Sequence, residues 1–232
     1  MVSRWYAELG GTGINQHQAK LMKKSISLML ILLALVGCSA PDKPSVSLYL
    51  AVQRGDLEQV ERHLHWGTDL NAAFPNGSYA LHEAVSLGRF VISKAILDAS
   101  SDINLRNQQG DSAIELAVLN GRIQIAELMI KRGAQINPDS TLLRLAQQDG
   151  YDRDSVKFLI EQGANLDTQD ATGDTSLIIA IRHNNHRLAH HLVNQGASVN
   201  QTSKTRLSPL AVAKQQKNTE LVNFLLKNGA SE

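Results

Sequence analysis

Residues 112–134 read SAIELAVLNGRIQIAELMIKRGA, and this stretch decides the fold. A hydroxyl side chain, Ser112, precedes a short apolar run, where it can accept from the free backbone N–H groups that begin a helix. A second apolar run ends at Gly133, and a glycine in that place is typical of the left-handed residue that terminates a helix. The stretch therefore predicts two short helices that are separated by a turn at Gly121.

The same features recur through the rest of the chain with a period of 33 residues. Positions that keep this spacing are Ala51, Ala84 and Ala117; Gly55, Gly88 and Gly121; Asn71, Asn104 and Asn137; and Gly163, Gly196 and Gly229. The period divides residues 45–232 into six units, at about 45–71, 72–104, 105–137, 138–167, 168–200 and 201–232. One unit is too small to bury its own apolar face, so stacking of neighbouring units has to supply the core.

A period of 33 residues with these motifs resembles the ankyrin repeat. The fullest first-helix motifs are residues 80–84 (ALHEA), 112–117 (SAIELA), 175–180 (TSLIIA) and 208–213 (SPLAVA). The resemblance implies an all-α protein, an α-solenoid of five to six helix–turn–helix units with short β-turn fingers. It also implies that His82 hydrogen-bonds neighbouring turns.

Two departures from the pattern have structural consequences. Unit four is three residues short, because Gly133 and Gly163 are only 30 residues apart, and its turn is replaced by Asn137-Pro138. We therefore expect a notch in the row of fingers. Asn184 and Lys217 stand where other units have glycine between their helices. Lysine tolerates positive φ poorly, so we expect the last of these turns to be less stable or shifted by one residue.

The N-terminal segment has the pattern of a leader. Residues 22–24 (MKK) begin with positive charge, and Ile26 to Val36 contains no charged residue. Such a run reaches only about 16 Å as a helix, too short to span a bilayer. Residues 22–37 therefore indicate a secretory signal peptide. Residues 1–21 form an upstream extension or a long n-region.

Residues 35–38 (LVGC) resemble the bacterial lipobox, and Cys38 is the chain's single cysteine. The resemblance implies that Cys38 carries a thioether-linked diacylglycerol and a fatty acyl chain such as palmitate. Residues 38–44 would then be a lipidated tether, followed by the repeat domain at 45–232. Ser39 replaces the Asp that the resemblance associates with inner-membrane retention. We therefore expect an outer-membrane lipoprotein that faces the periplasm of the bacterial cell envelope.

Composition and motifs argue against several classes of function. A net charge of +1 without a run of Lys or Arg does not favour a nucleic-acid partner. A single cysteine excludes internal disulfides and clusters of several cysteines around a metal. No Ser-His-Asp order, Cys-His pair, His-Glu-x-x-His motif or phosphate loop stands out. We therefore expect no cofactor and no enzymatic activity.

What remains is a surface for binding another protein, because first-helix ends and turn tips need not pack. The candidate contacts are Phe74, Tyr79, Arg54, Leu87, Arg106, Asn107, Asn120, Asp149, Arg182 and Gln216. Exposed aromatic residues are favoured as anchors. The predicted function is a non-catalytic protein–protein interaction module, lipid-anchored in the envelope. It would be an immunity-type inhibitor of a periplasmic toxin or a scaffold for an envelope protein.

The alternative is a periplasmic lipoprotein that binds a metal or a small ligand through the histidines between His183 and His191. His186 and His190 are four residues apart on one predicted helix, so both could reach one ion, with His183 as the third candidate. In the repeat register, however, His186 falls where apolar residues normally pack, which favours a structural role.

Overall fold

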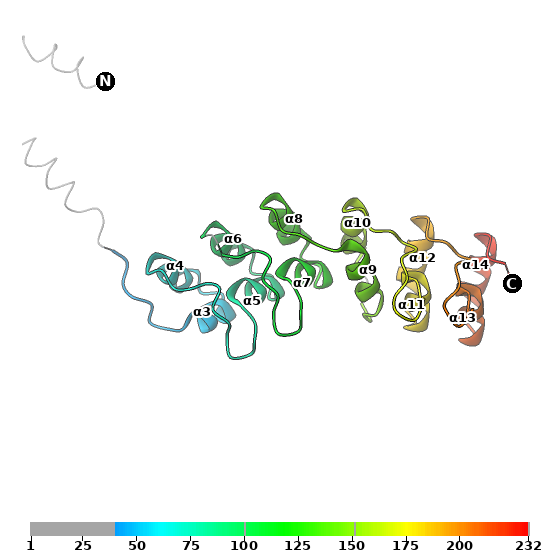
Figure 1. Cartoon of the computed structure of the whole chain (residues 1–232), viewed down its shortest axis with the longest axis horizontal. Helices are drawn as coiled ribbons and strands as arrows, with labels where there is room; N and C mark the ends of the chain where they lie inside the picture. The colour runs from blue at the N-terminus through cyan, green and yellow to red at the C-terminus, as the bar shows by residue number, and fades with distance from the viewer. Residues whose placement is uncertain (1–39, 100, 151, 232) are drawn as a thin grey trace, which may run out of the picture. The chain divides into compact units, whose positions relative to one another are not determined.

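The computed structural model describes residues 40–99, 101–150 and 152–231, and from Lys43 onward these form one compact unit. Twelve helices in the described residues alternate as six pairs (Figure 1). The first helices are α3 (Leu48–Arg54), α5 (Ala80–Ser86), α7 (Ala113–Leu119), α9 (Pro138–Ala146), α11 (Ser176–Arg182) and α13 (Pro209–Gln215). The second helices are α4 (Leu57–His65), α6 (Phe90–Asp98), α8 (Ile123–Lys131), α10 (Arg153–Glu161), α12 (His186–Asn194) and α14 (Thr219–Lys227).

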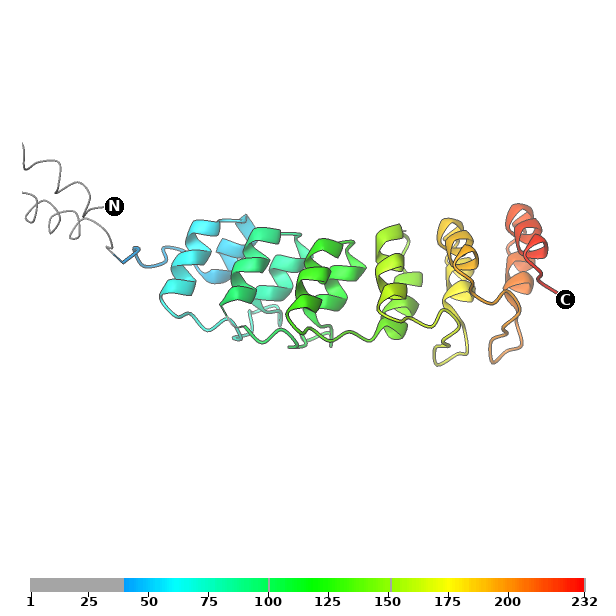
Figure 2. The same ribbon diagram turned by 90° about the horizontal axis from the view of Figure 1, so that it is seen from above.

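The pairs stack in chain order, so that each packs against its immediate neighbours (Figures 1 and 2). Each first helix contacts the next one along the stack, and the second helices form a parallel row. The alanine position shared by the first helices is fully buried in every unit, at Ala51, Ala84, Ala117, Ala146, Ala180 and Ala213. A small side chain there lets neighbouring helices approach closely. The fold class expected from the sequence, an all-α solenoid of helix–turn–helix units, is confirmed.

The predicted helix starts are confirmed. Ser112, Thr175 and Ser208 are the N-caps of α7, α11 and α13, and each hydroxyl accepts from the backbone N–H three residues later. At the inter-helix turns, Asn184 and Lys217 adopt positive φ (57° and 56°) in the glycine register. The turn at Lys217 is therefore not shifted, because the flanking helices hold lysine in the left-handed conformation.

Four β-turn fingers are present in the described part of the chain, and they belong to units two, three, five and six. In each, the backbone N–H of the first residue donates to the carbonyl of the last. Finger two is residues 74–78, finger three 107–111, finger five 170–174 and finger six 203–207. Neighbouring fingers are hydrogen-bonded, because the N–H of Gln108 donates to the Gly77 carbonyl (3.0 Å) and that of Lys204 to the Thr172 carbonyl (3.1 Å).

The described residues of unit four form no finger, and this leaves the expected notch (Figure 2). Only residues 132–137 separate α8 from α9, whereas residues 99–112 separate α6 from α7. Asn137 caps α9 through its side chain, and Pro138 occupies the first turn. One repeat after finger three, the chain is thus already helical, and fingers three and five face the place of a missing finger.

The leader, the lipobox and Cys38 lie outside the described residues. Within the described ranges, no helix is both long enough and apolar enough to span a bilayer. At the start of the solenoid, the Lys43 ammonium lies over the Trp66 ring, 5.3 Å from its centroid. The buried His63 imidazole donates from Nε2 to the Val46 carbonyl (2.8 Å), so this histidine ties the entering chain to α4.

Acidification is expected to weaken the stack through His82. The imidazole Nε2 donates to the Asp111 carbonyl of finger three (3.0 Å), as the resemblance implied, and burial lowers the pKa of His82 below its usual 6.5. The unfolded chain then binds the proton more tightly, so this contribution is intact above pH 6.5 and is lost as the pH falls below it.

The free energy of unfolding should therefore fall more steeply between about pH 7.5 and about pH 5.5 in the native chain than in His82→Gln. Glutamine keeps a hydrogen-bond donor but does not titrate. Denaturant unfolding at both pH values measures the two slopes, and equal slopes would rule out His82 as the sensitive group.

Candidate protein-binding surface

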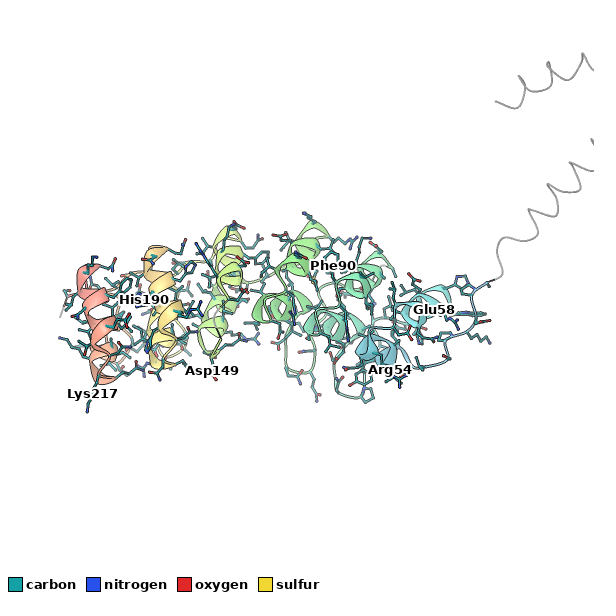
Figure 3. The ribbon with its side chains drawn as sticks, turned by 180° about the vertical axis from the view of Figure 1, so that it is seen from behind. Arg54, Glu58, Phe90, Asp149, His190 and Lys217 are labelled. Atoms are coloured by element: carbon teal, nitrogen blue, oxygen red, sulfur yellow. The ribbon has the colours of Figure 1, made fainter. Side chains whose placement is uncertain are left out.

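The ends of the first helices form a row along one edge of the solenoid. Figure 3 shows Arg54, Asp149 and Lys217 along this edge, whereas Phe90 and His190 lie on the row of second helices. The edge is built by the repeat itself, since each first helix ends at the same height. It presents one variable side chain from each unit.

Six of the predicted contact residues lie in this row, at or just beyond the end of each first helix. They are Arg54, Leu87, Asn120, Asp149, Arg182 and Gln216. Leu87 is an exposed apolar side chain (40%). Arg182 pairs with Asp174 (Nε to Oδ2, 2.9 Å), and Gln216 donates to the Arg182 carbonyl (3.1 Å). Two side chains of the row, Arg182 and Gln216, are therefore already engaged in bonds within the chain before any partner binds.

The other four predicted contacts lie in and beside fingers two and three, and all of them make contacts within the chain. Phe74 is half-buried and packs edge-to-face on Tyr49, with ring centroids 5.1 Å apart. The Tyr79 ring lies 5.4 Å from that of His82. The Asn107 side chain accepts from two backbone N–H groups and closes the turn of finger three. Phe74 thus stabilises the contact between units one and two.

A network of four charged side chains lies at the base of finger three, and the sequence identified only Arg106 of its members. Arg106 pairs with Glu115 (3.1 Å), and Arg144 of α9 pairs with Asp111 (2.7 Å). Arg106 also donates to the Gly110 carbonyl (2.6 Å). Glu115 is buried, whereas the side chains of Arg106 and Arg144 are 56% and 41% exposed. The overlooked signal is that Arg144 takes the repeat position held by His82 and Glu115.

A similar pair lies on the other side of the notch, at the base of finger five. Asp174 is buried, and this burial raises the pKa of its carboxyl group above the usual value. Its partner Arg182 has a side chain that is 42% exposed. On both sides, therefore, the acids are mostly buried and the arginines remain accessible.

The histidines of α12 lie at a hollow of about 710 Å³ between α10, α12 and α14. Its lining is Arg153, His186, Arg187, His190, His191, Asn194, Asn218, Glu220 and Leu221. His186 is hydrogen-bonded to Asn218 (3.0 Å), and the His190 ring stacks on Phe224 with centroids 3.9 Å apart. Burial, and then the charge of Arg153, lower the pKa of His191.

His183 is not part of this lining, because it is the C-cap of α11. Across the described ranges, no three or more His, Cys, Asp or Glu side chains are grouped so as to hold a metal ion. The structure therefore does not bring His183, His186 and His190 together as a ligand set. The two arginines in the hollow would also repel a cation.

The stacked helix pairs, the fingers and the exposed edge define a protein-interaction solenoid. A family model described as "Ankyrin repeats (3 copies)" matches residues 48–140 and 142–232, so the chain belongs to the ankyrin repeat family. Ankyrin repeats bind other proteins and are typically non-catalytic.

Three known proteins show the range of similarity. The human ASB11 ankyrin repeat domain matches with a TM-score of 0.69 and 23% identity, over 80% of this chain and 85% of that one. A chain in the complex of a Bdellovibrio bacteriovorus predatory endopeptidase with an immunity protein matches with a TM-score of 0.67 and 27% identity, over 80% and 99%. An L-asparaginase of Dirofilaria immitis is 30% identical over 148 residues, which are 62% of this chain and 25% of that protein. The match thus spans about a quarter of the curated relative.

Proposed function

We propose that the chain is a non-catalytic, lipid-anchored immunity-type inhibitor that holds a toxin or a hydrolase in the periplasm. The supporting observation is the similarity to a chain of the endopeptidase–immunity protein complex, which at 27% identity extends over nearly all of that chain. A stack of this kind presents a long edge of side chains, and covering an active site requires no chemistry of its own.

The proposed anchor is lipid on Cys38, in an outer membrane and facing the periplasm. Diacylglycerol plus one further acyl chain would make attachment effectively permanent, because a single chain binds only marginally. Attachment would keep the inhibitor concentrated where a toxin reaches the envelope.

Cys38→Ala should release the full chain from the membrane fraction, whereas Ser39→Ala should leave it there. Ultracentrifugation of cell lysates, followed by immunoblotting, measures both variants. Sedimentation of Cys38→Ala with the membranes would contradict the lipid anchor.

The binding role is tested by affinity capture from envelope extracts with the full chain. Immunity predicts near-stoichiometric recovery of a hydrolase whose activity falls in the complex. Recovery of a protein with unchanged activity would instead favour the scaffold role.

A second candidate function is the binding of a small anionic ligand in the α12 hollow. Its volume lies in the range of small-molecule sites, and Arg153 and Arg187 line it with three histidines, opposed by one acid, Glu220. This ligand class replaces the metal suggested by the histidine spacing.

Inorganic phosphate should raise the pKa of His191, because a bound anion stabilises the imidazolium, and Arg153→Gln should abolish the rise. Histidine NMR titration measures both, with sodium chloride at matched ionic strength as the control. An equal response to chloride would contradict the site. Zinc is expected to leave the melting temperature unchanged.

A further inference from the structure

The notch between fingers three and five is the place that a finger of unit four would occupy. In fingers two, three and five a glycine takes the left-handed position, and the space beside that glycine shows whether a following finger is present. A Cβ added at Gly77 would meet the Gln108 side chain at 2.4 Å, and one at Gly173 would meet the Lys204 backbone nitrogen at 2.5 Å. A Cβ at Gly110 would meet nothing within 4 Å. The space beside this glycine is thus filled by the next finger in units two and five, and it is open in unit three.

The groups that join neighbouring fingers are exposed on both sides of this notch. Between fingers five and six, the Gln169 side chain donates to the Thr202 carbonyl (2.9 Å). Arg106 takes the equivalent place in finger three, where no following finger offers a carbonyl. On the opposite side, Ala171 takes the place of Lys204, and its N–H donates to no acceptor in the described part of the chain.

Three arginines carry accessible positive charge around the notch, whereas the partly exposed Asp170 of finger five already accepts backbone N–H groups of its own turn. Arg106, Arg144 and Arg182 are each about half exposed, whereas their partners Asp111, Glu115 and Asp174 are mostly buried. An approaching segment therefore meets guanidinium groups and backbone groups, and not an apolar groove. This pattern favours a polar turn with an acidic side chain, because arginine binds carboxylates through paired hydrogen bonds.

We propose that an acidic β-turn of the partner protein occupies the place of the missing fourth finger. Its backbone would accept from Ala171 N–H and Arg106 and would donate toward the carbonyl groups of finger three, as the chain's own fingers do. Its Asp or Glu would pair with Arg144 or Arg182. This assignment rests on the proposed function, since it names the part of the inhibited protein that the solenoid holds.

A disulfide-closed peptide with residues 168–175 (TQDATGDT) is a suitable probe, because it is a finger of this chain that carries two acids. Added to the full-length chain, it should shift the backbone amide NMR signals of Gly110 and Ala171 with a Kd of about 1 mM, typical of a small polar contact. A peptide with asparagine in place of both acids should bind at least about tenfold more weakly, because asparagine can still close the turn, as Asn107 does in finger three, but carries no charge.

Gly110→Ala is the decisive variant, and Gly133→Ala is its matched control. Both glycines have positive φ (84° and 87°), and an added Cβ meets nothing in either case. Both variants therefore carry the same backbone strain, but only the Cβ at position 110 enters the notch. Peptide binding should be lost in Gly110→Ala and kept in Gly133→Ala. No shift at Gly110 and Ala171, or equal binding by both variants, would overturn the proposal.

Competition between the peptide and the captured envelope protein tests this proposal separately from the function on which it rests. If the captured envelope protein displaces the peptide, its turn occupies the notch. If it binds without displacing the peptide, the partner uses another face, so the notch assignment fails while the inhibitor function stands. Concentration-dependent dimerisation that Gly110→Ala abolishes would place a finger of a second copy in the notch and would also overturn the assignment to a partner.

Discussion

Gly173→Ala is expected to destabilise the chain far more than Gly110→Ala. Both substitutions force alanine into the left-handed region, at a cost of about 1–2 kcal/mol. Only at Gly173 does the new methyl group also meet backbone, the Lys204 nitrogen at 2.5 Å. Relief requires fingers five and six to separate, and overpacking of this kind adds about 1–3 kcal/mol.

Urea unfolding of the two variants measures the difference between their free energies of unfolding. Gly163→Ala is a further reference, since its φ is 90° and an added Cβ again meets nothing. It should match Gly110→Ala. Equal losses at Gly173 and Gly110 would mean that a finger occupies the notch in solution, contrary to the structure.

Leu177→Ala is expected to cost about 2–5 kcal/mol, because it leaves a cavity in a fully packed layer. Leu177 is completely buried on α11, which packs against α9, α12 and α13. Stability in a solenoid is a sum of units and nearest-neighbour interfaces, so the loss should spread first to units five and six.

Native-state hydrogen exchange resolves this effect by region. Amides of α11 to α14 should lose protection before those of α5 and α7. Leu226→Ala is the control, since that side chain is 46% exposed, and its effect should stay within about 0.5 kcal/mol. Uniform loss of protection along the whole chain would show that the stack unfolds as a single cooperative block.

The repeated features of the fold could be predicted from the sequence because they follow local rules. Hydroxyl caps such as Ser112 and the buried alanines recur at fixed spacing, so each unit supports the prediction of the others. The absence of a finger from the described residues of unit four could also be predicted from the sequence, since this unit is too short to form one. The unshifted turn at Lys217 could not be predicted, because the packing of the flanking helices outweighs the preference of lysine for negative φ.

The candidate site was less accessible to sequence reasoning. The Arg144–Asp111 pair joins residues of different units, and which side chains meet there depends on how units three and four stack. Phe74 and Asn107 were expected to face a partner, yet one packs on Tyr49 and the other closes its own finger. Exposure in a repeat register indicates where a partner can reach, but not which side chains are already engaged within the chain.

The most direct test of the central claim, that the fingers of the solenoid bind another protein, is site-specific photo-crosslinking in cells. A photoreactive residue would replace Gln109 at the exposed tip of finger three or, as control, the exposed Gln124 on α8. We expect one covalent adduct with an envelope protein from position 109 and none from position 124. An adduct from position 124 alone, or from neither position, would contradict a partner at the fingers.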